Sequence, residues 1–263
     1  MTLTSPVTRP VLGAFVATIL ATATSQAITT LVGAGVTGDP FLTSPGAAGT
    51  STWNDLNASA LPGYGGFPGF GAWPSPISSQ GAGDNSASLT KVSGAAYPAS
   101  GSIYFGGTLL TPNTNGAQLS VNDSTPVSGL TTIVFQIQFG EAMGYDFYNN
   151  VEPVLSFTAG AQGGTSVAAT YSGVISRFDN GTFDPGTGPE PLYTNTYGFQ
   201  WDLSGITEPI TGFNITFNGV QHSSLYGMKL EQFDQNPGGS LIPEPSFALL
   251  GGLGGLLLLR RKK

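Results

Sequence analysis

The chain contains 39 glycines and 19 prolines among its 263 residues, and this content restricts its fold more than any other feature. Proline removes a backbone donor and glycine has no side chain to pack, so both interrupt helices and favour turns. Outside the two terminal segments, no stretch of about 12 residues combines helical periodicity with freedom from glycine and proline. We therefore expect a domain of short strands joined by turns.

The clearest strand signal is an alternation of side chains over Thr132–Phe139. The odd-numbered positions are Ile, Phe, Ile and Phe, and glutamine occupies positions 136 and 138. This period of two is typical of a strand with one buried face. Phe213–Phe217 alternates in the same way. The other predicted strands are Ser102–Leu110, Gln118–Val121, Val154–Ala159, Ser166–Ile175, Tyr193–Leu203 and Ser223–Phe233.

With one or two more strands expected in residues 28–50, the total is about seven to ten. This number of short strands predicts that residues 28–235 form an all-β domain, an antiparallel β-sandwich or jelly roll, which we call the ectodomain. Val154–Ala159 and Ser166–Ile175 are expected to pair around a turn at Gly163-Gly164. Frequent glycine, proline and polar residues predict irregular structure elsewhere. The segments expected to be irregular are the aromatic-packed loop 62–83, the turn-prone stretch 84–100, the loop 179–191 and the linker 236–242.

The N-terminal segment has the pattern of a secretory signal helix. Arg9 precedes an apolar stretch, Val11–Leu20, and Ser25-Gln26-Ala27 fits the small-x-small rule for signal peptidase. Cleavage after Ala27 predicts a mature chain that starts at Ile28. An N-terminal anchor helix is the alternative, but Pro10 and the short apolar run argue against it.

Residues 243–263 combine three elements in a fixed order: Pro243-Glu244-Pro245, the apolar run Phe247–Leu259, and a basic end. The run is shorter than the about 20 residues of a comfortable membrane span. The positive-inside rule places the basic end in the cytoplasm and the ectodomain outside it. The residues predicted to form the short transmembrane helix and its basic stop-transfer end include Phe247, Leu250, Leu253, Leu256, Leu259, Arg260, Arg261, Lys262 and Lys263.

This tail resembles the PEP-CTERM sorting signal of Gram-negative bacteria. The resemblance implies that an exosortase, a membrane protease-transpeptidase, cuts near the motif and passes the protein to the cell surface. It also implies an association with exopolysaccharide and biofilm. Before processing, the chain is expected to be held in the inner membrane with its ectodomain in the periplasm. A plain C-terminal anchor is the alternative, although such an anchor does not need Pro-Glu-Pro before a short span.

Charge and cysteine content exclude several function classes. The basic residues between positions 28 and 242 are Lys91, Arg177 and Lys229, and acidic residues greatly outnumber them. A chain with so few cations lacks the basic stripe that a phosphate backbone requires, so we expect no nucleic acid partner. The chain contains no cysteine, which excludes thiol catalysis, zinc-thiolate sites and disulfides.

Candidate catalytic groups are few. A Ser-His-Asp triad would need His222, the single histidine, but no Gly-x-Ser-x-Gly elbow is present, and a turn histidine is the simpler interpretation. Paired carboxylates are the other candidates, because glycoside cleavage uses two acids. Solvated surface acids are the alternative for this acidic chain, and we expect no enzyme activity. The acids considered are Glu141, Asp146, Glu152, Glu190, Asp202 and Glu208.

Two binding motifs remain. Asp179, Asn180 and Asp184 form an oxygen-rich segment with a glycine, similar to a calcium loop, although an Asx turn explains the same residues. Aromatic residues in glycine- and proline-rich sequence predict exposed loops that stack on sugar rings, whereas burial in the core is the alternative. The aromatic residues concerned are Tyr64, Phe67, Phe70 and Trp73, together with Trp53.

Two hypotheses follow from these observations. The first is a non-enzymatic, exported protein of the cell envelope or extracellular matrix, without a cofactor unless calcium binds. The second is a carbohydrate-binding or carbohydrate-cleaving β-sandwich displayed by the same route. An acidic cleft flanked by aromatic residues would favour the second hypothesis, and complete burial of the aromatic residues would favour the first.

Overall fold

The computed structural model describes residues 40–81, 83, 86–184 and 188–242. These residues form two antiparallel sheets and contain no α-helix. Their helical elements are two short 3-10 turns, and neither is long and apolar enough to cross a membrane. The all-β prediction is confirmed. The predicted signal helix at 1–27 and membrane helix within 243–263 lie outside the described residues.

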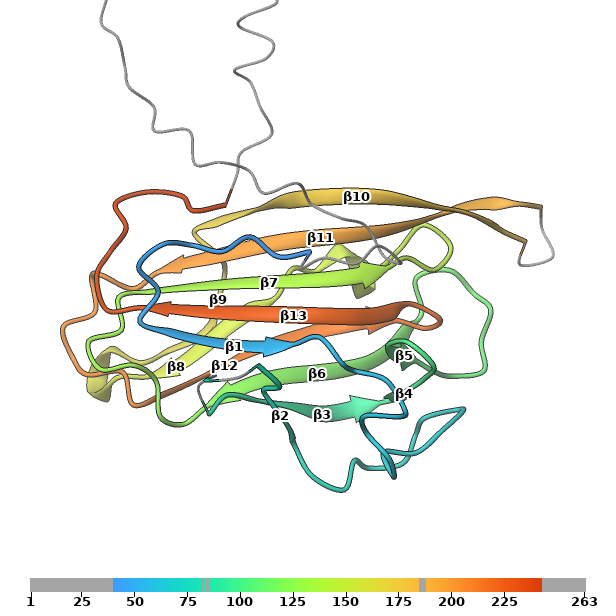
Figure 1. Ribbon diagram of the computed structural model, residues 1–263, viewed down its shortest axis with the longest axis horizontal. Helices are drawn as coiled ribbons and strands as arrows, with labels where there is room; N and C mark the ends of the chain where they lie inside the picture. Colours follow the sequence, from blue (N-terminus) through green and yellow to red (C-terminus); the bar gives the residue numbers. More distant parts are fainter. Residues whose placement is uncertain (1–39, 82, 84–85, 185–187, 243–263) are drawn as a thin grey trace, which may run out of the picture.

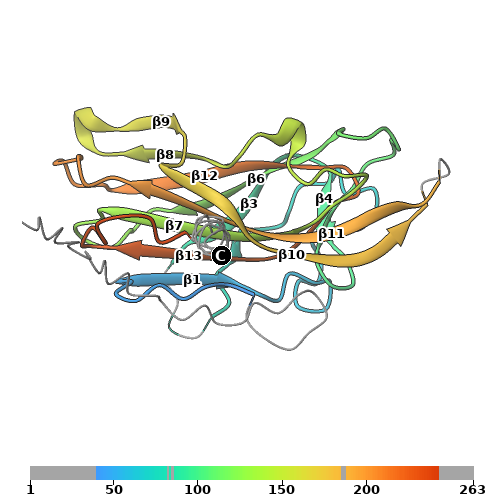
Figure 2. The ribbon, with the colours of Figure 1, turned by 90° about the horizontal axis from the view of Figure 1, so that it is seen from above.

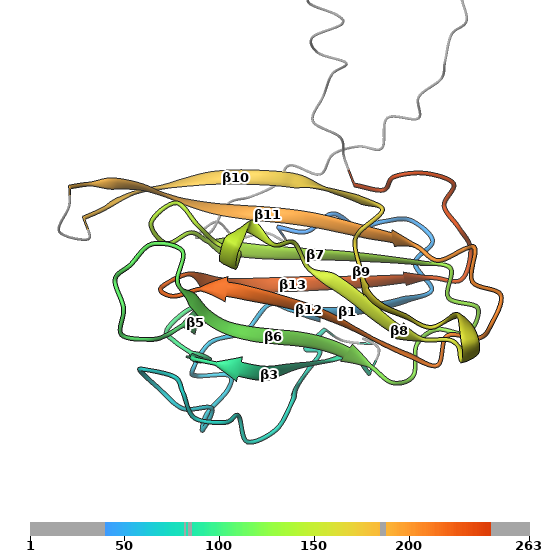
Figure 3. The same cartoon turned by 180° about the vertical axis from the view of Figure 1, so that it is seen from behind.

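The first sheet, called sheet A, has the order β10-β11-β7-β13-β5-β4, and β1 also pairs with β13 (Figure 1). The second, sheet B, has the order β2-β3-β6-β12-β8-β9 (Figure 3). The strands of sheet A are β1 (Gly49–Trp53), β4 (Ala96–Pro98), β5 (Ile103–Phe105), β7 (Thr132–Gly140), β10 (Tyr171–Phe183), β11 (Glu190–Asp202) and β13 (Ser224–Phe233). The strands of sheet B are β2 (Ile77–Ser78), β3 (Ser88–Gly94), β6 (Asn115–Asp123), β8 (Val154–Thr158), β9 (Gly164–Val167) and β12 (Gly212–Val220). Two 3-10 turns, η1 (Tyr148–Asn150) and η2 (Gly160–Gln162), complete the elements.

The two sheets pack face to face around one apolar core (Figure 2). Phe135 of β7 meets Phe217 of β12 across this core, with ring centroids 6.1 Å apart. Two buried tryptophans also tie the layers together. Trp201 Nε1 in sheet A donates to the carbonyl of Val167 in sheet B at 3.0 Å, and Trp53 Nε1 donates to that of Ile77 at 3.1 Å. This arrangement is that of a β-sandwich.

Strand β7 differs from its prediction, because both of its faces are buried. The core side carries the predicted alternation. On the outer side, Gln136 exchanges two hydrogen bonds of 2.8 Å with the backbone of Leu42. Val134 packs there against Ile242, which belongs to the segment predicted to be a linker. The chain segments before β1 and after β13 therefore cover the outer face of sheet A.

A buried ion pair fixes the first of these covering segments. Lys229 Nζ lies 3.2 Å from Glu231 Oε1, and both residues are almost fully buried on β13. The lysine also donates to the carbonyl of Leu42 and to Thr43 Oγ1. The Glu231 carboxylate accepts hydrogen bonds from the backbone and the hydroxyl of Ser44. These bonds satisfy the charges within the protein.

Four other predictions about the strands are wrong. The stretch 84–100 contains β3 and β4, and the loop predicted at 179–191 is mostly strand, because β10 and β11 form a long hairpin. Ser166–Ile175 is not one strand: its first residues belong to β9 of sheet B and its last to β10 of sheet A. The described residues form 13 strands, more than the number expected. Residues such as those of β10, which bury no face, give no alternation to detect.

Candidate functional site

A cavity of about 490 Å³ lies at one end of sheet A. It is formed where β5 and β13 meet, beside the end of β7 and the hairpin of β10 and β11. Its volume is in the range of small-ligand sites, and its lining is mainly apolar. The lining residues are Tyr104, Leu110, Gly140, Glu141, Ala142, Met143, Asn180, Phe183, Leu192, Tyr193, His222, Ser224 and Tyr226.

Three tyrosines supply most of the aromatic surface of the cavity, and each comes from a different strand. The ring of Tyr226 lies against Gly140, where any side chain would collide with it. One face of Tyr193 is covered by the Arg177 guanidinium, whose Cζ lies 3.7 Å from the ring centroid. Tyr104 is half-buried, and this burial is the main cause of a raised pKa of its hydroxyl. The electrostatic effect of the nearby Tyr97 is the second cause. The Tyr104 hydroxyl therefore remains a neutral hydrogen-bonding group near pH 7.

His222 lies in the turn between β12 and β13, as the simpler interpretation of the sequence predicts. Its Nε2 is 2.8 Å from the carbonyl oxygen of Leu109, which can only accept, so Nε2 carries the proton. Its Nδ1 then accepts from the Tyr104 hydroxyl at 2.6 Å. The backbone of His222 has φ of 71°, a region that costs energy for a residue with a side chain. His222 thus positions Tyr104, and both ring nitrogens are occupied.

Two of the predicted acids meet beside the cavity. Glu141 and Asp146 accept hydrogen bonds of 2.6 and 3.0 Å from the same nitrogen, Nδ2 of Asn195. Arg177 forms an ion pair with Glu141 at 3.3 Å. The Tyr197 hydroxyl donates to Asp146 at 2.6 Å. The pKa of that hydroxyl is raised mainly by burial and secondly by the negative charge of Asp146.

The hydrogen bonds of this acidic cluster fit a structural role and not a catalytic one. Asn195 is 1% exposed, and its amide occupies the space between the two carboxylates. Glycoside cleavage needs that space for the scissile oxygen or a water molecule. Asn195 therefore bridges the two carboxylates in a structural hydrogen-bond network beside the cavity. Of the four remaining predicted acids, Glu152 accepts from Ser172, and Asp202 accepts from Ser204 and Asn236. Glu190 begins β11, and Glu208 lies beside Gly160.

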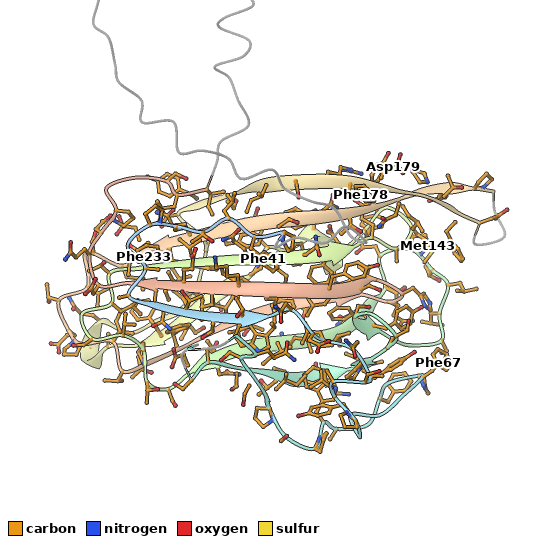
Figure 4. The ribbon with its side chains drawn as sticks, in the orientation of Figure 1. Phe41, Phe67, Met143, Phe178, Asp179 and Phe233 are labelled. Atoms are coloured by element: carbon orange, nitrogen blue, oxygen red, sulfur yellow. The ribbon has the colours of Figure 1, made fainter. Side chains whose placement is uncertain are left out.

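The predicted sugar-stacking residues divide into two groups. Tyr64 and Trp73 pack edge to face at 5.8 Å and lie against the core, and Trp53 is fully buried. Phe67 and Phe70 are 64% and 62% exposed. Figure 4 shows Phe67 at the periphery of the molecule. Their loop is ordered, as predicted, although β2 interrupts it. Lys91 holds the loop through hydrogen bonds to the carbonyls of Gly69, Gly71 and Ala96, and burial lowers the pKa of this lysine.

The residues of the predicted calcium loop are not gathered around one point. Asp179 and Asn180 belong to β10, where Asp179 Oδ1 accepts from the backbone of Gly181 at 2.8 Å in an Asx turn. The Asn180 amide donates to Thr194. Asp184 accepts from the backbone of Gly188. Among the described residues, no group of three or more His, Asp or Glu side chains is placed to hold a metal ion.

The tyrosines of the cavity are not among the predicted site residues. Two of them have a local signal: Tyr104 lies between Ile103 and Phe105, and Tyr226 follows Leu225, so their rings point away from the core. That pattern identifies the face of a strand but gives no indication that several such faces converge. The predicted sorting motif Pro243, Glu244 and Pro245, the predicted membrane run, its basic end and the predicted Ala27-Ile28 cleavage site all lie outside the described residues.

Comparison with known proteins identifies no relative, because no protein-family model, curated protein or solved structure matches this chain.

Proposed function

We propose that this protein is an exported component of the cell envelope or extracellular matrix, sorted through a PEP-CTERM signal at residues 243–263. The observation that carries the proposal is the order of Pro-Glu-Pro, a short apolar run and four basic residues. Signal peptidase removes residues 1–27, and an exosortase-like enzyme processes the tail. The ectodomain itself is non-enzymatic and associates with exopolysaccharide.

The geometry of the ectodomain supports this arrangement. The described chain starts and ends on the outer face of sheet A, where Leu42 bonds to Gln136 and Leu241 bonds to Gln200. Ile242, the last described residue before the proposed sorting motif, is buried against Val134 and Phe233. The described β-sandwich therefore extends to Ile242, the residue that directly precedes the proposed sorting motif.

Mass spectrometry of the two ends of the surface-exposed protein tests the sorting proposal. We expect an N-terminus at Ile28 and a C-terminus within or close to Pro243-Glu244-Pro245, because both terminal segments are removed during export. The inner-membrane fraction of the same cells should contain the form that still carries residues 247–263. A surface protein with an intact Met1 or an intact Lys263 would contradict the proposal.

The cavity supports a second function for the same ectodomain, the binding of an uncharged glycan. Tyr104, Tyr193 and Tyr226 offer ring faces for sugar rings and hydroxyls for hydrogen bonds. Among the described residues that line the cavity, Glu141 is the one with a charged side chain, and Arg177 pairs with it. This described lining offers no free cation to hold an anionic polymer, and a neutral saccharide fits its chemistry best.

Replacement of Tyr226 by alanine tests this binding site. We expect Tyr226→Ala to weaken binding of the neutral exopolysaccharide fraction roughly tenfold, because it removes one stacking surface. Affinity electrophoresis in gels that contain the polysaccharide measures the change. Phe70→Ala is the matched control, because Phe70 is an exposed aromatic residue on another loop. Equal losses in both variants would place the glycan outside the cavity, and loss in Phe70→Ala alone would place it on the loop.

A further inference from the structure

Among the described residues, strand β10 is an unusually long sheet edge that pairs with a strand on one side alone. It contains 13 residues, lies at the end of sheet A, and pairs on one side with β11 (Figures 1 and 2). The other described strands at the sheet ends, β1, β2, β4 and β9, contain five residues or fewer. Short edge strands prevent pairing between molecules, as do Lys and Pro, which are missing from β10. Among the described edge strands, β10 is therefore the longest one that another chain could extend.

The charges on β10 are self-complementary. Its two charged residues, Arg177 and Asp179, lie on either side of Phe178 and have opposite signs. Both side chains lie on the same face of the strand, because side chains alternate along it. The Arg177 side chain is 53% exposed, Asp179 is exposed, and Phe178 is 38% exposed at the outer edge (Figure 4).

We propose that two copies of this chain associate through β10, antiparallel, with the twofold axis at Phe178. This register places Arg177 of each copy opposite Asp179 of the other and brings the two Phe178 rings together. An axis at Arg177 or Asp179 would instead place like charges opposite each other, and an axis at any other residue of β10 would leave both charges without a partner across the interface, so the charge pattern favours the axis at Phe178. Sheet A then continues from one molecule into the next.

The interface is small. Irregularities in the pairing of β10 with β11 occur between Val174 and Ser176 and between Asp179 and Thr182, so the regular stretch is Ser176–Asp179. One short pair of strands buries less surface than stable protein interfaces need. The association is therefore weak in dilute solution and grows where the protein is concentrated, as on a cell surface. The dimer does not depend on the sorting signal or on glycan binding.

Single cysteine variants test the register, because the natural chain contains no cysteine. In Phe178→Cys, the thiol at position 178 of one copy lies opposite the thiol at position 178 of the other copy, within reach of a disulfide. Ser176→Cys lies on the same face but is offset from its copy by four residues, roughly 13 Å, which is too far. After mild oxidation of the full-length chain in detergent, we expect a covalent dimer from Phe178→Cys and monomer from Ser176→Cys. Equal dimer yields, or no dimer from Phe178→Cys, would overturn the proposal.

A charge variant tests the complementarity by a separate measurement. Asp179→Lys places like charges opposite each other twice, and we expect it to weaken the dimer about fivefold or more in sedimentation equilibrium. Asp234→Lys changes the net charge equally at an exposed position outside β10 and should leave the association unchanged. An equal effect of the two variants, or no effect of Asp179→Lys, would show that β10 does not pair in this register.

Discussion

Replacement of Pro243-Glu244-Pro245 by three alanines is expected to stop processing of the tail while export continues. The proposal assigns the two prolines the role of preventing a helix from running back through the motif, so that Glu244 can be recognised. Alanine favours a helix and removes the carboxylate. We expect membrane insertion to continue, because the change leaves the proposed membrane segment Phe247–Leu259 and the basic end intact.

Fractionation and mass spectrometry measure this effect. The triple variant should accumulate in the inner membrane at the mass of the unprocessed chain, with little protein at the cell surface. Ser246→Ala is the matched control, since it alters the adjacent residue and keeps the motif. If the triple variant reached the surface at the wild-type rate and with the wild-type mature mass, the motif would be a linker before an ordinary anchor.

The parts of the fold that the sequence predicts are those with one apolar face. The alternation over Phe213–Phe217 falls within β12, and that over Thr132–Phe139 identifies β7. Strand β3 was missed because Leu89 is its one fully buried residue. The burial of Gln136 could not be predicted either, because its partner Leu42 is 94 positions away in the chain. Periodicity reports one strand at a time, whereas coverage of a sheet depends on distant segments.

For the candidate site as well, some features could be predicted from local sequence and others could not. Glycine and proline around Phe67 and Phe70 predict exposed aromatic residues, and both are exposed. The same pattern fails for Trp73, because a loop that contains several aromatic residues can turn some of them toward the core. The cavity depends on the convergence of β5, β11 and β13, which are far apart in sequence. That convergence is a property of strand order, which local sequence does not specify.

Lys229→Met is expected to lower the free energy of unfolding by about 3–5 kcal/mol, because it leaves the Glu231 carboxylate buried without its cation. The substitution keeps most of the volume of the side chain, so the loss of charge dominates. The Lys229 contacts with Leu42 and Thr43 disappear as well, which loosens the segment that covers the outer face of sheet A. The effect is larger than that of a surface ion pair because both residues are at most 5% exposed.

Urea unfolding followed by tryptophan fluorescence measures the change, since Trp53 and Trp201 are fully buried and become exposed on unfolding. The double variant Lys229→Met/Glu231→Met is the informative control. It removes the unpaired charge and is expected to recover at least about 1 kcal/mol of the loss, even though Ser44 then lacks its acceptor. If the double variant were less stable than the single one, the hydrogen bonds to Ser44 would contribute more than the burial of an uncompensated carboxylate costs. In that case Glu231 would act mainly as an acceptor for the covering segment, and the lysine would be secondary.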